Sequence, residues 1–164
     1  MIAIRPMRTD DVDIIVNFHA NTDETFFHQW GGGRFYTYPL TKKQIAKRMK
    51  NTRNTRFFAA TLDDTVIGMA ELDFTNWENK ECAVCRFLIG EAYRSKGYGQ
   101  EVLRLLCAHA FDELGMRKVK LTVFDFNASA YKCYLKAGFR VTSEEIRPNG
   151  WKAIKMELER FTHG

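Results

Sequence analysis

The chain has 164 residues, of which 45% are hydrophobic and 27% charged, and this composition fits one globular domain with a single core. Charged residues near the start leave no room for a signal peptide, and no run approaches the ~20 apolar residues of a membrane helix, so we expect a cytoplasmic protein with no membrane partner. The net charge of +5 suits an anionic ligand, but the basic residues are scattered, so no nucleic-acid partner is expected.

The first forty residues predict a strand, a helix and a long loop. Residues 2–6 alternate in hydrophobicity as a short edge strand does, and apolar residues recur at helical spacing over residues 12–19. Residues 21–40 have no clean period and combine three glycines with many aromatic residues. A long loop within a compact domain is usually functional or disordered, and the aromatic content argues against disorder.

The middle of the chain predicts one helix followed by three strands. Thr41 and Gln44 have the spacing of a capping box, in which two side chains bond main-chain N–H groups at the start of a helix, here over residues 41–51. Three strand-like runs follow, and the first two are typical of a hairpin. These runs cover residues 56–62, 66–74 and 82–89.

The C-terminal part predicts two helices and three strands. A helical pattern ends at Gly115, alternation over residues 118–124 indicates a strand, and Asn127 is a good N-cap for a helix that ends before Gly138. A last hairpin has its strands at residues 139–146 and 151–158.

The order of these elements, β-α-α-β-β-β-α-β-α-β-β, predicts an α/β protein with a mixed sheet rather than a uniform βαβ array. We expect a mostly antiparallel sheet of about seven strands flanked by about four helices. Because no repeat or linker divides the sequence, these elements are expected to form one domain over residues 1–164.

The four cysteines predict neither a disulfide framework nor a metal site. Cys107 and Cys133 fall within helical patterns, whereas Cys82 and Cys85 form a CxxC inside a strand-like run. A zinc ribbon needs a second CxxC or a Cys/His pair, and a redox CxxC opens a helix. We therefore expect buried thiols and no metal.

Residues 89–100 join a strand to a helix and have the chemistry of a phosphate-binding loop. Gly97 and Gly99 allow the backbone to approach a ligand, and Arg94 and Lys96 add positive charge beside the helix N-terminus. A Walker loop would need GxxxxGK[ST], and a dinucleotide-binding fingerprint would need a third glycine; the segment has neither. A tight strand-to-helix turn without a ligand stays open as an alternative.

Two motifs in a fixed order carry a family resemblance. Residues 94–99 read Arg-x-x-Gly-x-Gly, and the segment from Asn127 to Phe139 reads Asn-x-x-Ala-x-x-x-Tyr-x-x-x-Gly-Phe. With both motifs the chain resembles the GNAT superfamily of N-acetyltransferases, most firmly over residues 82–139. The long loop before the second helix gives a faint similarity to the branch that includes ribosomal-protein N-terminal and spermidine acetyltransferases.

The resemblance implies an acetyl-CoA site in a cleft between two central strands. The main chain at Phe87 and Ile89 would pair with the pantetheine arm, and residues 94–100 would hold the pyrophosphate. The residues thereby assigned to the cofactor are Phe87, Leu88, Ile89, Arg94, Ser95, Lys96, Gly97, Tyr98, Gly99, Gln100, Asn127 and Tyr134.

Tyr134 is the general acid that the resemblance implies. Asn127, Ala130 and Tyr134 share one helix face. If that face lies along the thioester, a phenol of ordinary pKa about 10 could give its proton to the departing thiolate. The alternative is a core aromatic side chain whose hydroxyl bonds elsewhere.

The resemblance does not assign a general base. Ala83 occupies the strand position where some family members carry a glutamate. Glu81 on the same strand face, and Glu71 and Asp73 on one face of the preceding strand, are the candidate bases. Each of them is equally well interpreted as a solvated strand residue, and family members also act without one dedicated base.

The aromatic loop over residues 21–40 lies where the family builds its acceptor pocket. Asp23 and Glu24 could supply negative potential for a cationic amine there. Core packing is an equal alternative for the aromatic side chains. The candidate substrate-binding residues are Phe26, Phe27, Trp30 and Tyr36.

Together these features predict an acetyl-CoA-dependent N-acetyltransferase that acts by direct attack of a primary amine in a ternary complex. The acceptor would be a small molecule, a polyamine or a protein N-terminus. A non-catalytic CoA-binding or partner-binding module on the same fold is the alternative. Dimers are common in the family, so a homodimer is compatible with the resemblance.

Overall fold

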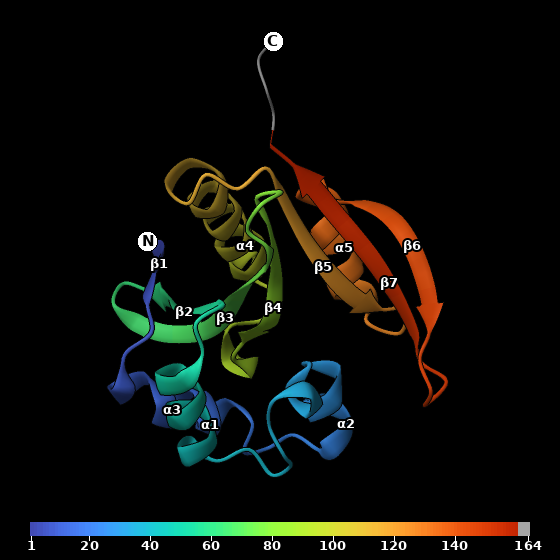
Figure 1. Ribbon diagram of the computed structural model, residues 1–164. Coiled ribbons are helices and arrows are strands. Elements are labelled where there is room, and N and C mark those ends of the chain that lie inside the picture. Colours follow the sequence, from blue (N-terminus) through green and yellow to red (C-terminus); the bar gives the residue numbers. More distant parts are fainter. Residues whose placement is uncertain (161–164) are drawn as a thin grey trace.

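Residues 1–160, the part of the chain that the computed structural model describes, contain one seven-stranded sheet of order β1-β2-β3-β4-β5-β7-β6 (Figure 1). Within these residues β4 and β5 form the parallel pair and the other neighbours are antiparallel, which confirms the predicted mixed sheet. The domain predicted over residues 1–164 extends into residues 161–164, which lie outside the described part. The strands are β1 Ile2–Pro6, β2 Thr55–Leu62, β3 Thr65–Asn76, β4 Glu81–Ile89, β5 Lys118–Phe124, β6 Arg140–Ile146 and β7 Lys152–Glu159.

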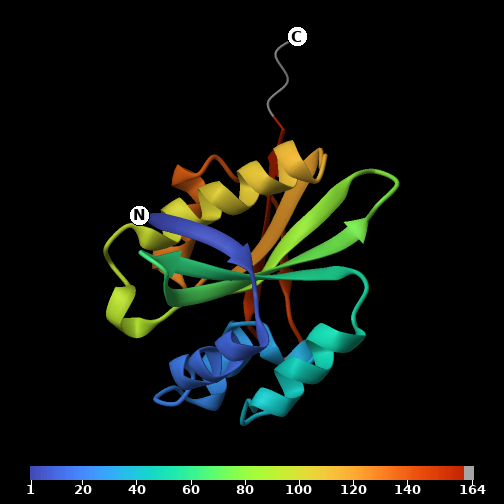
Figure 2. The same cartoon turned by 90° about the vertical axis from the view of Figure 1, so that its left-hand side faces the viewer.

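Five α-helices of residues 1–160 cover the two faces of the sheet. α4 and α5 pack on one face, and α1, α2 and α3 pack on the other, so that the central strands lie between two helical layers (Figure 2). In this part of the chain, no helix is both long enough and apolar enough to cross a membrane. The helices are α1 Val12–Phe18, α2 Glu24–Gln29, α3 Lys42–Asn51, α4 Tyr98–Ala108 and α5 Ala128–Lys136.

The segment of residues 21–40, which we expected to be a loop, contains α2 and a 3₁₀ turn at Gly32–Arg34, so the expectation of about four helices was one short. Asp23 caps α2 by accepting a hydrogen bond from the Phe26 main-chain N–H at 2.9 Å. Six residues are too few to show a helical period. Burial of Phe27, rather than the propensity of so short a helix, stabilises α2.

The capping box predicted for α3 is only half formed. Thr41 accepts a hydrogen bond from the Gln44 main-chain N–H at 3.4 Å. The Gln44 side chain instead bonds the main chain of Thr37 and Pro39, at 2.8 to 3.1 Å. The chain before α3 folds back over the first helical turn, and these main-chain groups therefore replace the N-cap N–H as partners.

Alternation along β2 divides the core between the two faces of the sheet. Phe58 and Ala60 pack in the cluster that contains α4, whereas Phe57 and Ala59 pack with α1 and α3. This follows because successive side chains of a strand point to opposite faces. Each large apolar side chain so removed from water contributes roughly 1.5–3 kcal/mol. The strands are therefore firmly held on both faces.

The strands β4 and β5 separate part-way along their length. They pair over three residues, the last of which joins Ala83 to Lys120, although β4 continues to Ile89 and β5 to Phe124. A bulge at Arg86, whose φ is 47°, shifts the register of β4 against β3 just beyond that point. The main chain of β4 beyond Ala83 consequently has an open edge toward β5.

Candidate active site

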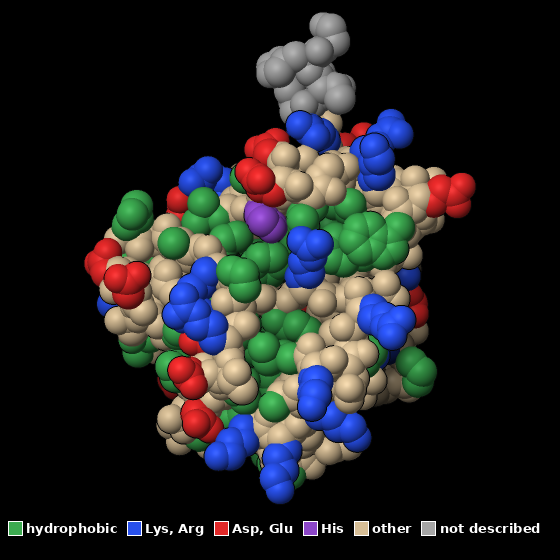
Figure 3. All heavy atoms as spheres, turned by 60° about the vertical axis from the view of Figure 1, so that its left-hand side comes forward, with side chains coloured by type: hydrophobic (Ala, Val, Ile, Leu, Met, Phe, Trp, Pro, Cys, Tyr) green, Lys and Arg blue, Asp and Glu red, His purple; other side chains and the backbone are tan. Residues whose placement is uncertain are grey.

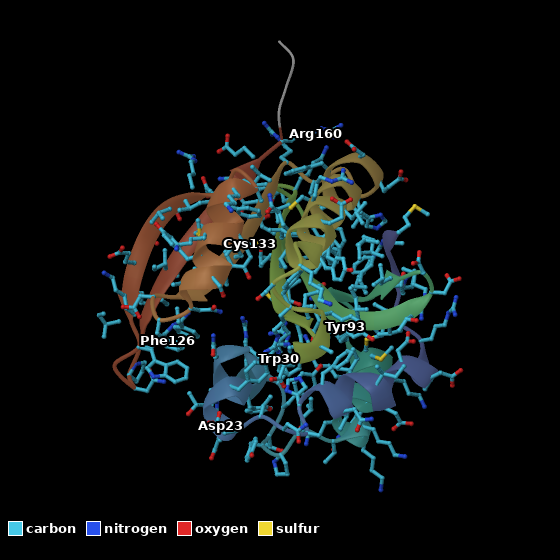
Figure 4. All side chains as sticks on the ribbon, turned by 180° about the vertical axis from the view of Figure 1, so that it is seen from behind. Asp23, Trp30, Tyr93, Phe126, Cys133 and Arg160 are labelled. Atoms are coloured by element: carbon cyan, nitrogen blue, oxygen red, sulfur yellow. The ribbon has the colours of Figure 1, made fainter. Side chains whose placement is uncertain are left out.

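A cleft of about 1530 Å³ opens where β4 and β5 separate. Its walls come from β4, β5, α5, the start of α4, the end of α2 and the loop between β6 and β7. Figure 4 shows three of these sides, with Cys133 on α5, Tyr93 beyond the end of β4 and Trp30 at the end of α2. This volume exceeds the roughly 300–1,000 Å³ of a usual ligand pocket, so the cleft has room for a cofactor together with a second substrate.

The loop between β4 and α4 brings main-chain N–H groups to the cleft. α4 begins at Tyr98, after Ser95 and Gly97, whose φ values are 61° and 82°. The first four N–H groups of a helix have no acceptor within it. Gly99 also lines the cleft, and a Cβ there would lie 3.7 Å from Ile89, an ordinary contact. Protein packing does not require glycine at this position, so its bare backbone leaves space for a ligand.

Most of the residues assigned to the cofactor line this one cleft. The exceptions are Lys96, which is exposed beside the loop, and Tyr98, which packs against the core. The lining residues come from three separate elements that the fold brings together. They are Phe87, Leu88, Ile89, Arg94, Ser95, Gly97, Gly99, Gln100, Asn127 and Tyr134.

Arg94 is anchored at the edge of the cleft by one of its N–H groups. Its Nε donates a hydrogen bond to the Ile89 carbonyl at 2.8 Å, and its guanidinium lies 5.4 Å from the centroid of the Phe26 ring. Its other N–H groups have no partner among residues 1–160. Burial, together with the Arg94 charge, lowers the pKa of the neighbouring His19 to about 4, so His19 adds no charge at neutral pH.

Tyr134 lies on α5 and lines the cleft. Asn127 caps this helix by accepting a hydrogen bond from the Ala130 N–H at 3.4 Å, and both residues line the cleft with Tyr134. The Tyr134 hydroxyl has no hydrogen-bond partner in the described chain, and its ring centroid lies 6.2 Å from that of Phe139. Burial, with a smaller effect of Cys133, raises the pKa of Tyr134 well above 10. The phenol therefore keeps its proton at neutral pH.

The three candidate bases do not line the cleft. Glu71 is fully buried and pairs with Arg48 of α3 and with Arg86, the latter at 2.8 Å. Burial raises the pKa of Asp73, but the charge of Arg86, 2.6 Å away, together with hydrogen bonds from Thr55 and Arg86, outweighs burial and lowers it. A hydrogen bond from Lys120, at 2.8 Å, lowers the pKa of Glu81. Asp73 and Glu81 are consequently weak bases.

Among residues 1–160, Glu157 of β7 is the one acidic side chain that lines the cleft, and the sequence did not single it out. Its side chain is 13% exposed and pairs with Lys118 at 3.6 Å and Arg140 at 2.9 Å. It reaches the cleft because the register of β5 and β7 places it opposite Lys120. Alternation along β7 could have shown which face Glu157 takes, but not which strand lies beside it.

The candidate acceptor residues divide into two pairs. Phe26 and Trp30 line the cleft, whereas Phe27 and Tyr36 are core residues with 1% and 4% exposure. The Tyr36 hydroxyl donates to Glu71 at 3.3 Å, and burial, followed by the Glu71 charge, raises the pKa of Tyr36 to about 12. The packing alternative therefore describes Phe27 and Tyr36, and contact with an acceptor stays a prediction for Phe26 and Trp30.

The cysteines of the cleft are protonated thiols. Burial raises the pKa of Cys85 to about 12 and also raises the pKa of Cys133. Because the thiolate is the nucleophilic form, neither residue is suited to carry an acyl group at neutral pH. In the described part of the chain, no three His, Cys, Asp or Glu side chains gather as they would around a metal ion.

Most of the elements that build the cleft lie within a region that matches a known protein family. The model of the Acetyltransferase (GNAT) family matches residues 18–139, which include β4, the loop before α4, and Tyr134. The chain belongs to this family. The resemblance indicated by the two sequence motifs is thereby confirmed.

The relatives of this GNAT chain include several acetyltransferases. It is 33% identical over 73 residues to the spermine/spermidine N(1)-acetyltransferase of Bacillus subtilis, a match that covers 44% of the chain and 47% of the relative. It is 25% identical over 160 residues to the probable N-acetyltransferase YjcK of Bacillus subtilis, covering 91% and 87%. The chain thus spans about half the length, 47%, of two of its curated relatives, the first of which is this spermine/spermidine acetyltransferase.

A solved structure shows the same fold over nearly the whole chain. The spermidine N-acetyltransferase of Vibrio cholerae, in complex with CoA and spermine, matches with a TM-score of 0.81 and 17% identity. The match covers 96% of this chain and 95% of the other. The mixed sheet predicted from the order of elements and the GNAT fold implied by the two motifs are therefore confirmed.

Proposed function

We propose that this chain is an acetyl-CoA-dependent N-acetyltransferase that transfers an acetyl group to the primary amine of a small molecule. The observation that carries the proposal is the cleft at which the open edge of β4, the loop before α4 and Tyr134 converge. Family membership supports acetyl transfer. Relatives named for spermine and spermidine acetylation support an amine as the acceptor.

Acetyl-CoA would fit the cleft through the edge of β4 that β5 leaves open and through the N–H groups at the start of α4. The main chain of Phe87 and Ile89 lies on the open edge of β4, where the pantetheine amides would bond as a neighbouring strand does. The N–H groups at the start of α4 carry the positive end of the helix dipole and would bind the pyrophosphate oxygens. Arg94 would add charge-assisted hydrogen bonds at the same place.

The reaction would join the amine to the acetyl group directly. The neutral amine nitrogen attacks the thioester carbonyl carbon, the C–N bond forms, the C–S bond breaks, and Tyr134 gives its proton to the departing thiolate. The surplus proton of the amine leaves to solvent in the cleft, and solvent returns a proton to Tyr134. The burial that raises the pKa of Tyr134 would also raise the pKa of the CoA thiol beside it, because burial disfavours the charged form of both groups. The two pKa values therefore shift in the same direction.

A thiol-release assay with acetyl-CoA and a mixed panel of primary amines tests this activity. We expect release of the CoA thiol to depend on the amine. Acetyl-CoA binding without release for any amine would favour the non-catalytic CoA-binding module instead. Absence of binding would remove the cofactor assignment as well.

The Arg94→Ala substitution is expected to raise the Kd for CoA about tenfold or more, because a hydrogen bond to a charged group contributes roughly 1.5–3 kcal/mol. Isothermal titration calorimetry measures the Kd of each protein. Arg104→Ala is the matched control, since Arg104 lies on exposed α4 surface, pairs with Glu101 and does not line the cleft. An unchanged Kd for Arg94→Ala would contradict the loop assignment.

We also propose that the chain assembles as a homo-oligomer. One solved neighbour, the spermidine N-acetyltransferase of Vibrio cholerae, is described as dodecameric. In this chain β6 is an edge strand whose residues are all exposed. That edge of the sheet is therefore available for contact with a second copy.

A further inference from the structure

The lining of the cleft is strongly positive. Among residues 1–160, eight lysine and arginine side chains line it, against the single carboxylate of Glu157. On the face of the molecule in Figure 3, by contrast, basic side chains are spread between acidic and apolar ones. The whole chain has 25 lysine and arginine residues against 20 acidic ones, so the charge of the cleft is a local feature and not only a result of the net charge of +5.

An anionic cofactor accounts for part of this charge. Arg94 precedes α4, and Lys132 and Lys136 lie on α5, so these three are on the walls assigned to acetyl-CoA. Arg86 is already paired with two carboxylates of β3, the buried Glu71 and the half-buried Asp73. Four of the eight basic side chains are left.

These four lie away from the cofactor walls. Alternate residues of β5 point into the core beneath α4 and α5, so Lys120 and Thr122 point to the opposite side of the sheet. The register of β5 with β7 places Lys155 opposite Thr122 and therefore on that side too. Arg147 follows β6, and Arg34 ends the 3₁₀ turn after α2. We call Arg34, Lys120, Arg147 and Lys155 the basic wall.

Nearby carboxylates neutralise the basic wall only in part. Glu81 pairs with Lys120 at 2.8 Å. Glu145 is shared between Lys155, at 3.1 Å, and Arg147, at 3.6 Å. Arg34 is exposed and has no ion-pair partner in the described chain. Four positive charges thus face two carboxylates.

The acidic residues that could attract a cationic acceptor either lie outside the cleft or are already paired with basic residues. Asp23, one such candidate, caps α2 through the Phe26 N–H, and Glu24 lies 3.6 Å from His28 one turn later. Neither carboxylate lines the cleft. Glu157 does line it, but two basic residues hold its carboxylate. A polyamine, with several ammonium groups at neutral pH, would meet like charge in this cleft.

We propose that the acceptor is a primary amine that also carries an anionic group, a carboxylate or a phosphate, and that it is not a polyamine. The inference rests on the proposed N-acetyltransferase function and narrows its substrate class. The anionic group would bind the basic wall and direct the amine toward the thioester. The same positive field would lower the pKa of the acceptor amine, because nearby like charge disfavours the ammonium form. This would supply neutral amine without a dedicated base.

A series of butylamines that differ only in the terminal group tests the proposal. The group is cationic in 1,4-diaminobutane, neutral in 4-aminobutan-1-ol, and anionic in 4-aminobutanoate and 4-aminobutylphosphonate. We expect kcat/KM to rise from the cationic amine through the neutral amine to the two anionic amines, by about tenfold or more between the cationic and anionic amines. The carboxylate and phosphonate members show which anion is preferred. The preference should shrink at high ionic strength, because salt screens the wall.

Charge-reversal variants locate the preference within the cleft. Arg34→Glu reverses one charge of the basic wall without leaving an ion-pair partner behind, and Lys155→Glu is the second variant. Each should lower kcat/KM for the anionic amines about tenfold and raise it for 1,4-diaminobutane. Lys43→Glu, on exposed α3 surface outside the cleft, makes the same change of net charge and should leave the order unchanged.

The outcomes separate this inference from the proposed function. Acetylation of 1,4-diaminobutane in preference to the anionic amines would overturn the inference and leave the N-acetyltransferase standing. Equal rates for all four amines, unaffected by Arg34→Glu and Lys155→Glu, would also overturn it. Failure to acetylate any of these amines or any member of the mixed panel would overturn the proposed function itself.

Discussion

The Tyr134→Phe variant is expected to lower kcat by about 10²–10⁴-fold, the usual contribution of a positioned general acid. The substitution removes only the hydroxyl of a residue that lines the cleft, and this hydroxyl has no hydrogen-bond partner in the described chain. The thiolate would then leave unprotonated or take its proton from water. Because the ring remains, the Kd for acetyl-CoA should change little. Steady-state thiol release and calorimetric titration measure the two quantities.

Tyr131→Phe is the matched control for this variant. Tyr131 lies on the same helix, is partly buried against the same core cluster and does not line the cleft. Its loss of a hydroxyl should leave kcat close to that of the unmodified protein. A kcat of Tyr134→Phe equal to the control would remove the acid role and leave Tyr134 as a core aromatic residue.

The Glu71→Ala variant is expected to lower the free energy of unfolding by about 3–5 kcal/mol, the cost of breaking a buried ion pair from one side. Glu71 has no exposed surface and accepts contacts from Arg48, Arg86 and the Tyr36 hydroxyl. Its removal leaves the positive charges of the Arg48 and Arg86 guanidinium groups with fewer carboxylate partners in the protein interior. Urea unfolding followed by tryptophan fluorescence measures the change.

An exposed ion pair provides the comparison. Glu101 pairs with Arg104 at 2.6 Å on the surface of α4, where water solvates both groups. Glu101→Ala should therefore leave the urea midpoint nearly unchanged. A Glu71→Ala midpoint equally close to that of the unmodified protein would show that the buried cluster does not hold β3, β4 and α3 together.

The local elements, and the strand, loop and helix that form the side of the cleft proposed for the cofactor, could be predicted from the sequence. The strands of the two hairpins and the helices that become α3 and α5 follow from patterns within ten or so neighbouring residues, which decide local hydrogen bonding and which face is apolar. Asn127 was expected to cap its helix and does. Residues 94–99 were expected to join a strand to a helix N-terminus, and the structure has that arrangement. The helix α2 was missed because six residues are too few to show a period.

The charge on the side of the cleft proposed for the acceptor was decided by the tertiary structure. Glu71 and Asp73 looked like available carboxylates, but the pairing of β3 with β4 and the packing of α3 bring Arg86 and Arg48 to them. Glu157 joins the cleft because β7, not β6, is the neighbour of β5. Periodicity reports the face on which a side chain lies. The charge that it meets depends on contacts between distant segments. The sequence by itself therefore determined the family, the fold and the glycine loop before α4, whereas the tertiary structure decided the charge of the wall proposed to face the acceptor.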